Sequence, residues 1–449
     1  TMTGLARAGV APGDRVLLRL GNSVDFPLAF FAAAGMGALP VPSSAQWTQR
    51  EVDIAAQTVG PALVLADGSG AVPKGVPVIG PETYRPWRRL PPADYADTAA
   101  DDPAYILFTS GTGGAPKGVV HAHRAAWARR MMWRDWYELH ADDRLLHAGA
   151  FNWSYTLGTG ITDPWAAGAT GLIYAGPPDR AVWSALIARH QATIFAAAPG
   201  VFRQLLGSGQ AARTDFTTLR HALTAGDHMA DSLRAAWLAL TAKPIYEALG
   251  MTEVSTYASQ SPERPRLTPQ RGRRVAVLTE DGEIAAPGRM GRLAVSSRDP
   301  GLMRGYGRGE GARPDLPLQG EWFVTGDMAV MDDTGALIHK GRADDVMNAQ
   351  GYRVSAAEVE AVLMAHPGVA EAAALPLPVR ADVEVIAACV VPAPHADITE
   401  ADLAAHCNSQ LAAYKCPRLY HILPSLPRTA TGKVLKRQLR RELGKEAAP

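Results

Sequence analysis

The most informative stretch of the sequence is Thr109-Ser-Gly-Thr-Gly-Gly-Ala-Pro-Lys-Gly118, which directly follows the apolar run Tyr105 to Phe108. Such a run predicts a buried strand, so the glycine-rich stretch is expected to form the loop that follows this strand. Its glycines and hydroxyl side chains let backbone N–H and side-chain O–H groups converge on phosphate oxygens, and Lys117 adds a positive charge. The stretch therefore predicts a phosphate-binding loop, with a flexible surface turn as the alternative.

The same residues exclude a P-loop nucleoside triphosphatase. A Walker A loop has glycine before its lysine and serine or threonine after it. Here Pro116 and Gly118 occupy those two positions. A backbone donor and the magnesium-binding hydroxyl are both missing, so another class of phosphate-binding protein is indicated.

Strand-like runs and helical patterns alternate on both sides of this loop. Strands are expected over 15–20, 62–66, 105–108 and 193–197, and a helix over 180–189. This alternation predicts buried, mostly parallel α/β sheets. After about residue 270 the segments shorten, and the turns Glu280-Asp-Gly, Pro287-Gly and Asp332-Asp-Thr-Gly predict antiparallel hairpins. Beyond Gly341, a helix over 356–364 and a strand over 370–376 suggest a separate α+β domain with a hinge near Asp344.

Composition narrows the class of protein further. The chain has 45 Lys and Arg against 44 Asp and Glu, a formal net charge of +1. This near balance does not favour binding to a nucleic acid or to an anionic membrane. The three cysteines, Cys389, Cys407 and Cys416, have no C-x-x-C spacing, which favours a reducing compartment without a zinc ribbon. Prolines and glycines interrupt the longest uncharged stretch, 26–47, so no membrane insertion is expected and the predicted location is cytoplasmic.

The glycine-rich stretch resembles the T-S-G-T-T-G-x-P-K-G signature of the adenylate-forming superfamily, which includes acyl-CoA synthetases, peptide-synthetase adenylation domains and luciferases. Further motifs of that family follow in order: Ala225-Gly-Asp-His228, Tyr246-Glu-Ala-Leu-Gly-Met-Thr-Glu253, Trp322-Phe-Val-Thr-Gly-Asp327, the hinge block Gly341 to Arg353, and Leu426-Pro-Arg-Thr-Ala-Thr-Gly-Lys433. The resemblance extends from about Gly9 to Arg440. Read alone, the Thr-Glu pair would better suit a helix N-cap, and both Gly-Asp pairs would be ordinary turns.

The resemblance implies an α/β fold. A large N-terminal domain of stacked, mostly parallel sheets with helices, at 1–343, would carry a small β-rich subdomain at about 270–340. A small mobile α+β lid domain would follow at 344–449. Relatives usually carry more residues before the first helix, so an N-terminal piece is expected to be missing.

It also implies a set of site residues. Thr252 would meet the α-phosphate, Glu253 would hold magnesium, and Lys433 would be the catalytic cation, assisted by Lys117. The implied ATP- and AMP-binding residues are Thr109, Ser110, Gly111, Thr112, Gly113, Gly114, Lys117, Gly226, Asp227, His228, Glu247, Ala248, Leu249, Gly250, Met251, Thr252, Asp327, Arg342 and Arg353. The implied CoA-binding residues are Gly351, Tyr352 and Arg353, with Asp344 as the hinge.

The implied acyl pocket consists of Phe151, Asn152, Trp153, Tyr155, Ala198 and Gly226. Amino-acid-activating relatives carry an aspartate where this chain has Asn152, and a neutral amide cannot pair with a substrate ammonium. The three aromatics could shorten the pocket, which favours a short, medium or aryl carboxylate; equally, they could simply fill the core.

The resemblance implies ATP-dependent activation of a carboxylic acid through an acyl-adenylate, then transfer to CoA, with ATP, Mg²⁺ and CoA required. Two alternatives stay open: loading of a carrier-protein phosphopantetheine, and a non-catalytic nucleotide-binding relative. The presence of Lys433 and Glu253 disfavours the second, and the lack of an appended carrier domain mildly favours free CoA. The expected partners are small molecules only, and the oligomeric state is left open.

Two other patterns are not interpreted as sites. His121-Ala-His123 has metal-like spacing without a nearby third ligand. Asp142-Asp143 is expected to be a solvated turn.

Overall fold

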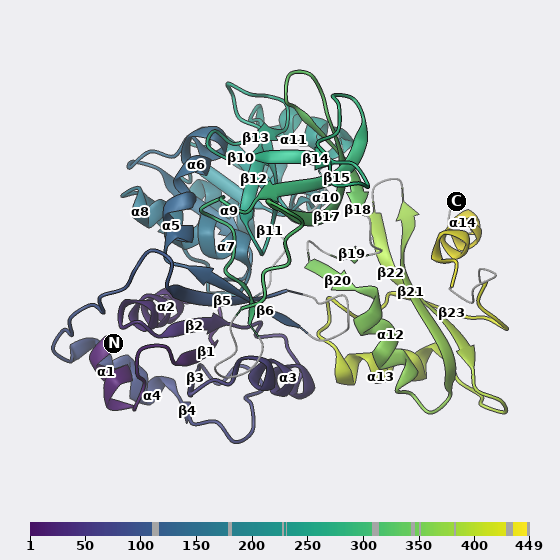
Figure 1. Cartoon of the computed structure of the whole chain (residues 1–449), viewed down its shortest axis with the longest axis horizontal. Coiled ribbons are helices and arrows are strands. Elements are labelled where there is room, and N and C mark those ends of the chain that lie inside the picture. The colour runs from purple at the N-terminus through teal and green to yellow at the C-terminus, as the bar shows by residue number, and fades with distance from the viewer. Residues whose placement is uncertain are drawn as a thin grey trace. The chain divides into compact units, whose positions relative to one another are not determined.

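The computed structural model describes residues 1–109, 116–177, 182–226, 229, 231–307, 314–342, 346–349, 352–380, 383–427 and 434–446 (Figure 1). The chain divides into two compact units. The first comprises Thr1–Ala45, Thr58–Phe108 and Gly118–Asp344, and the second Gln46–Gln57, Thr109–Lys117 and Asp345–Pro449. Across the described ranges, none of the helices is both long and apolar enough to cross a bilayer.

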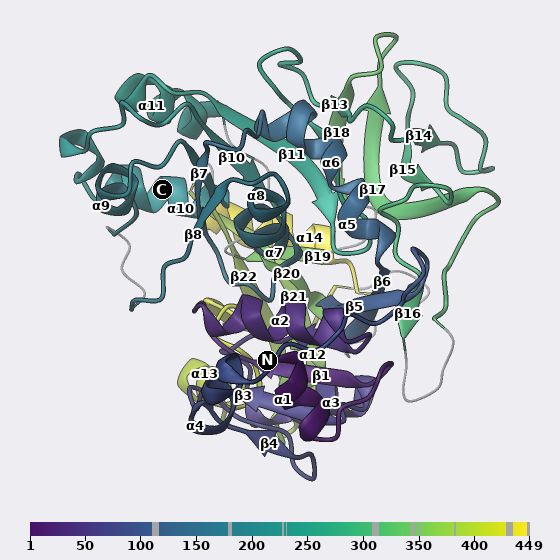
Figure 2. The ribbon, with the colours of Figure 1, turned by 90° about the vertical axis from the view of Figure 1, so that its left-hand side faces the viewer.

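The first sheet of the large unit is parallel throughout, in the order β2-β1-β3-β4. Its strands are β1 (Arg15–Arg19), β2 (Leu39–Pro42), β3 (Leu63–Ala66) and β4 (Val78–Ile79). Val16 and Leu18 face one core, to which helix α2 (Asp25–Gly35) contributes, and Leu17 faces another. Helix α2 lies along one face of this sheet (Figure 2). Burial on both faces explains why these strands are continuous apolar runs rather than alternating ones.

A seven-stranded sheet forms the centre of the unit, in the order β13-β12-β11-β10-β9-β7-β8. Strands β7 to β11 pair in parallel, whereas β12 and β13 are antiparallel. The bounds are β7 (Arg144–Ala148), β8 (Thr170–Leu172), β9 (Ile194–Ala197), β10 (His221–Ala225), β11 (Ile245–Met251), β12 (Ser255–Ser259) and β13 (Thr268–Pro269). Helices α9 (Val182–Arg189), α10 (Pro199–Gly207) and α11 (Asp231–Thr241) share one core with it, and α6 (Arg130–Met132), η2 (Trp133–Tyr137) and α7 (Ser154–Leu157) contribute to another.

The hairpin signals after residue 270 correspond to an antiparallel sheet in the order β14-β15-β17-β18. Its strands are β14 (Val275–Leu278), β15 (Met290–Ser296), β17 (Trp322–Met331) and β18 (Leu337–Arg342). The predicted α/β fold class, with parallel sheets followed by a β-rich part, is therefore confirmed.

A three-stranded sheet joins distant parts of the sequence, in the order β16-β6-β5. Strands β5 (Pro103–Thr109) and β6 (Lys117–Ala122) flank the glycine-rich stretch, and β16 (Gly305–Gly307) pairs antiparallel with β6, placing Tyr306 opposite Val119. The remaining short helices of the unit are α1 (Met2–Arg7), α4 (Pro81–Tyr84), η1 (Arg85–Arg89), α5 (Arg124–Ala128), η3 (Gly158–Thr162), α8 (Asp163–Ala166) and η4 (Ala211–Arg213).

The second unit is α+β. Its strands are β19 (Val346–Ala349), β20 (Tyr352–Ser355), β21 (Val369–Arg380), β22 (Val383–Pro392) and β23 (Leu419–Ile422). Its helices are α12 (Ala356–Met364), α13 (Glu400–Gln410), α14 (Lys436–Glu446) and most of α3 (Gln49–Val59), whose last two residues belong to the first unit. Thr399 and Asp402 cap α13 with a reciprocal capping box, which explains where that helix begins.

Candidate active site

The predicted Thr-Glu motif lies in a turn between two strands. Strand β11 ends at Met251, and β12 begins at Ser255 and returns antiparallel to it. A Cβ atom on Gly250 would lie 2.7 Å from the backbone of Ser255 and Thr256, so the strands can approach this closely only because residue 250 is glycine. The N-cap alternative for Thr252 and Glu253 is wrong, because no helix starts there.

Glu253 is buried, with 5% of its surface exposed. Its Oε1 accepts a hydrogen bond of 2.8 Å from the hydroxyl of Tyr306, and its backbone carbonyl accepts one of 2.8 Å from the N–H of Met303. Its Oε2 has no partner among the described residues. A buried carboxylate oxygen without a partner is costly, so this oxygen fits a bound cation.

Thr252 is held through its backbone carbonyl, which lies 2.9 Å from Nε2 of His121 on β6. Burial lowers the pKa of His121 to about 4, so the ring is neutral near pH 7. Because a carbonyl can only accept, Nε2 carries the proton in this contact. The ring also stacks on Tyr105, with centroids 4.7 Å apart. No motif or spacing in the sequence predicts this contact between His121 and Thr252.

The ends of the glycine-rich stretch are defined by strands. Thr109 is the last residue of β5 and Lys117 the first of β6, and both are partly buried. The predicted phosphate-binding residues between them, Ser110, Gly111, Thr112, Gly113 and Gly114, lie outside the described residues.

The predicted nucleotide-binding motif that contains Gly226 follows β10. Gly226 has φ +95°, a conformation that favours glycine, whereas Asp227 and His228 lie outside the described residues. On the neighbouring strand, the carboxylate of Glu247 pairs with Arg234 at 2.8 Å. Ala248 and Met251 are buried and Leu249 is partly buried, so their side chains belong largely to the core.

Asp327 lies within β17 and is buried, with 5% of its surface exposed. Its backbone N–H donates to the hydroxyl of Thr325 over 3.2 Å, and its Oδ1 lies 3.5 Å from Nε2 of His339. Gly326 precedes it with φ +80°, and Arg342 is its partner on β18. Asp327 thus lies at an irregular point of β17, where the register with β18 shifts between Asp327 and Ala329.

The predicted acyl-pocket aromatics belong to different packing clusters. Phe151 packs against Phe26, with ring centroids 5.2 Å apart. Tyr155 donates its hydroxyl to the carbonyl of Leu223 over 3.1 Å and lies in the core beneath the central sheet. Ala198 is buried too, and Asn152 and Trp153 are partly buried. A role for these residues in binding an acyl group stays a prediction.

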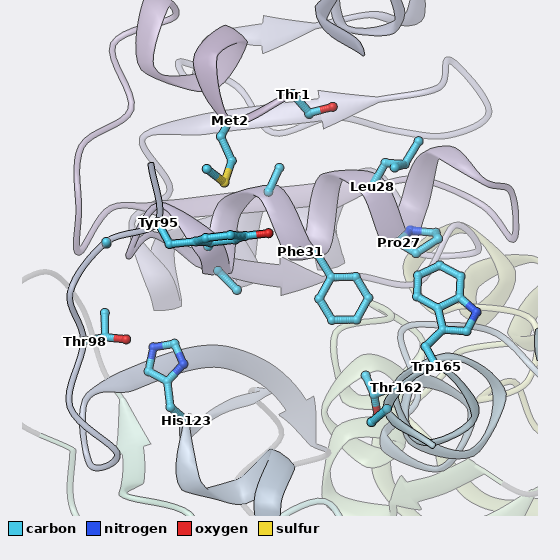
Figure 3. Close-up of a pocket in the computed structure, with 15 residues that line it drawn as sticks. Thr1, Met2, Pro27, Leu28, Phe31, Tyr95, Thr98, His123, Thr162 and Trp165 are labelled. Carbon is cyan, nitrogen blue, oxygen red and sulfur yellow. The ribbon is translucent and has the colours of Figure 1, made fainter. Parts of the chain in front are cut away.

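A cavity of about 250 Å³ is lined by the Thr-Glu turn and by helix α7, and its lining does not include the predicted Phe151, Asn152, Trp153 or Tyr155. Thr252 and Ser255 line one part of it, and Ser154 and Leu157 another. A larger cavity of about 780 Å³ (Figure 3) lies along α2 and α8. The two cavities share the lining residues Phe31, Ala34, His123, Thr162 and Ala166.

A buried ion pair lies beside the smaller cavity, which Arg129 helps to line. Arg129 contacts both carboxylate oxygens of Asp163, at 2.7 and 2.6 Å, and Tyr137 donates its hydroxyl to the same carboxylate over 2.9 Å. Arg129 also donates to the hydroxyl of Ser255, the first residue of β12. The pairing satisfies both buried charges and ties β12 to the helical layer.

The remaining predicted residues belong to the second unit or its border. Tyr352 is partly buried, and its ring stacks on Tyr414 with centroids 3.9 Å apart. Asp344, Gly351 and Lys433 lie outside the described residues, as do the side chains of Arg342 and Arg353.

Asp143 corrects one minor prediction. Only 2% of its surface is exposed, and Arg220 pairs with it at 2.7 Å, so this turn carboxylate is buried rather than solvated.

Comparison with known proteins identifies the family. The model of the AMP-binding enzyme family matches residues 3–307, and that of the AMP-binding enzyme C-terminal domain matches residues 358–433. The chain belongs to the AMP-binding enzyme family. The predicted membership of the adenylate-forming superfamily is thereby confirmed.

Individual relatives of this AMP-binding enzyme are CoA ligases. The 3-hydroxybenzoate–CoA/4-hydroxybenzoate–CoA ligase of Thauera aromatica is 30% identical over 463 residues, covering 96% of this chain and 88% of that protein. The long-chain-fatty-acid–CoA ligase FadD13 of Mycobacterium tuberculosis is 30% identical over 478 residues, covering 98% and 90%. A malonyl-CoA ligase structure with methylmalonyl-CoA and AMP bound is 26% identical, with a TM-score of 0.80 over 95% of this chain and 93% of that one.

Proposed function

We propose that this AMP-binding enzyme is an acyl-CoA synthetase that joins a compact carboxylic acid to CoA and converts ATP to AMP and pyrophosphate. The observation that carries the proposal is the buried Glu253 beside Thr252, with one carboxylate oxygen held by Tyr306 and the other without a partner in the described part of the chain. A site of this kind suits a cation that neutralises phosphate charge.

The chemistry needs two steps, because a carboxylate has no good leaving group. First, a carboxylate oxygen of the acid attacks the α-phosphorus of ATP and pyrophosphate leaves, which gives an acyl-adenylate. The thiolate sulfur of CoA then attacks the acyl carbon, a C–S bond forms, and AMP leaves. Negative charge grows at the α-phosphate in the first step, so preorganised donors and cations there lower the barrier.

The side chains have separate roles in this scheme. The Thr252 hydroxyl would donate to the α-phosphate, and Lys117 and Lys433 would bring positive charge to the phosphates in the first step. Asp327 would accept hydrogen bonds from the ribose hydroxyls, because a carboxylate is an acceptor only.

Glu253 would hold Mg²⁺ together with phosphate oxygens of ATP. Within the described ranges no three His, Cys, Asp or Glu side chains gather to bind a metal. One carboxylate completed by substrate phosphates is a common way for proteins to bind Mg²⁺. When bound, the ion would neutralise phosphate charge.

The second half-reaction would use the C-terminal domain, 344–449. A turn about Asp344 would withdraw Lys433 and bring the Gly351, Tyr352 and Arg353 segment to the thiol of CoA. Separate poses for the two steps would let one acyl site serve both reactions.

The proposed substrate is a short, medium or aryl carboxylic acid. Asn152 offers no negative charge to an α-ammonium group, and burying such a cation without a partner costs several kcal/mol. The similarity to a hydroxybenzoate ligase supports an aromatic acid. In this proposal Phe151, Trp153 and Tyr155 would shorten the acyl pocket, which disfavours long fatty acids.

The test is a panel of acids assayed for ATP-dependent pyrophosphate release and for CoA consumption. We would compare kcat/KM for butyrate, benzoate, 3-hydroxybenzoate, octanoate, palmitate and phenylalanine. The proposal predicts that one of the compact acids is best. Palmitate as the best substrate would contradict the pocket assignment, and phenylalanine would contradict the role of Asn152. Pyrophosphate release without CoA consumption would point to a carrier-protein acceptor.

A further inference from the structure

Two side chains of the three-stranded sheet contact the Thr-Glu turn. Tyr306 on β16 donates its hydroxyl to Oε1 of Glu253 over 2.8 Å, and His121 on β6 contacts the carbonyl of Thr252 at 2.9 Å. The strands that carry them are neighbours in that sheet. Strand β16 therefore holds Glu253, and strand β6 holds its neighbour Thr252.

The backbone of Tyr306 is fixed on both sides. Its register partner across the antiparallel pair is Val119, and on its other side its N–H and C=O groups exchange hydrogen bonds of 2.8 and 3.0 Å with Asp315. Gly305 has φ +138°, and a Cβ there would collide with the backbone of Asp315. The segment therefore leaves little freedom in where the phenol hydroxyl can lie.

The ring of Tyr306 is also packed. It lies against the core cluster that includes Met251 and Val254, the residues on either side of Thr252 and Glu253. A partly buried ring with a fixed backbone presents its hydroxyl at a defined point. That hydroxyl occupies one carboxylate oxygen of Glu253 and leaves the other, Oε2, without a partner among the described residues.

We infer that Tyr306 is a positioning residue that orients the Glu253 carboxylate for its divalent cation. This inference rests on the proposed function, because it takes Glu253 as the cation ligand. A neutral donor on Oε1 fixes the torsion of the carboxylate and leaves Oε2 available to the cation. Hydrogen bonds to a metal-binding carboxylate commonly act in this way.

The test is the binding of Mn²⁺, as a probe for Mg²⁺, to the protein saturated with a non-hydrolysable ATP analogue, followed by electron paramagnetic resonance. Tyr306→Phe removes one oxygen atom and keeps the ring. We expect its Mn²⁺ affinity to fall roughly 10-fold or more, while analogue binding in the absence of metal is unchanged. Affinities are normalised to the nucleotide-binding fraction, so a partly unfolded preparation does not alter them.

Tyr174→Phe is the matched control. It removes a tyrosine hydroxyl that donates to the carbonyl of Pro177 over 2.8 Å in an exposed turn, and it should bind Mn²⁺ like the wild type. In a Glu253→Gln background, Tyr306→Phe should cause no further loss of Mn²⁺ affinity, because the hydroxyl would act only through that carboxylate.

Three outcomes separate the claims. A wild type without nucleotide-dependent Mn²⁺ binding would refute Glu253 as a cation ligand and the inference with it. A binding wild type with an equally tight Tyr306→Phe variant would refute only the role of Tyr306. A further loss in the Glu253→Gln background would assign Tyr306 a general structural role and overturn the inference. In activity assays, the Mg²⁺ concentration for half-maximal rate should rise more in Tyr306→Phe than the KM for the acid.

Discussion

Glu253 is the proposed cation ligand because it is buried and only one of its carboxylate oxygens has a partner among the described residues. Removing its charge while keeping its shape, as in Glu253→Gln, should lower kcat/KM for ATP-dependent pyrophosphate release by about 100-fold, because charge at the phosphates is then less well neutralised. Transfer to CoA from a supplied acyl-adenylate should change much less. The exposed Glu283 provides the control, and Glu283→Gln should behave as the wild type. Equal losses in both half-reactions would contradict the assignment.

Gly158 shows how tightly the layer beneath the site is packed. A Cβ at this position would overlap the guanidinium of Arg129, which its pair with Asp163 holds in place. We expect Gly158→Ala to lower the free energy of unfolding by about 1–3 kcal/mol, measured by urea denaturation. Gly207→Ala is the control, because open space surrounds that Cβ position. Similar stability of the two variants would show that Arg129 can move aside.

Several of these residue roles could not be predicted from sequence. The pairing of Arg129 with Asp163 joins residues with no shared motif, and the contact of Tyr306 with Glu253 depends on a strand that lies far along the chain. Asp143 was predicted to be a solvated turn residue, whereas it is buried and pairs with Arg220. Motif residues are recognisable because their types and spacing recur, whereas their supporting partners are set by tertiary packing alone.

Strand β6 carries His121, whose ring contacts the backbone carbonyl of Thr252. His121→Gln keeps an amide donor near the position of Nε2, whereas His121→Met fills similar space without one. Losing that donor leaves the Thr252 carbonyl unpaired at a cost of about 1–3 kcal/mol. We therefore expect His121→Met to reduce kcat for pyrophosphate release by roughly 10-fold or more, and His121→Gln to retain more activity.

The pH profile provides the check on this assignment. Because burial lowers the pKa of His121 to about 4, its ring stays neutral from pH 6 to 9. Neither variant should therefore shift the pH optimum of pyrophosphate release. A shifted optimum in His121→Gln would indicate that the imidazole exchanges a proton during the reaction.

Hydrophobic periodicity predicted those helices and strands whose bounds depend on local sequence. The helix expected over 356–364 is α12, Ala356–Met364, and the strand expected over 370–376 lies within β21. The packing of Phe151 and Tyr155 was less predictable. The two side chains belong to different cores, which the pattern of one short segment cannot reveal. Likewise, the pairing of β16 with β6 brings together segments that only the tertiary fold places side by side.

The stability of the whole molecule should depend on pH through its buried histidines. Burial lowers the pKa of His147 to about 3, against 6.5 in an unfolded chain. Between these values the unfolded chain binds more protons, so the free energy of unfolding falls as pH decreases, by up to about 1.4 kcal/mol per pH unit for this residue. His147→Leu should make that fall shallower between pH 6 and 4.5. Parallel curves for the two proteins would contradict the low pKa.

We propose that this chain activates an acid through an adenylate before CoA enters. The most direct measurement is a rapid-quench experiment with benzoate, or whichever acid of the panel is best, and ATP·Mg²⁺, analysed by mass spectrometry. Without CoA, the wild type should accumulate enzyme-bound acyl-AMP and pyrophosphate in equal amounts, and added CoA should convert this acyl-AMP to acyl-CoA and AMP. Lys433→Ala should fail in the first step yet convert supplied acyl-AMP. Acyl-CoA formed with ADP and phosphate, or without any acyl-AMP, would contradict the proposed adenylate route.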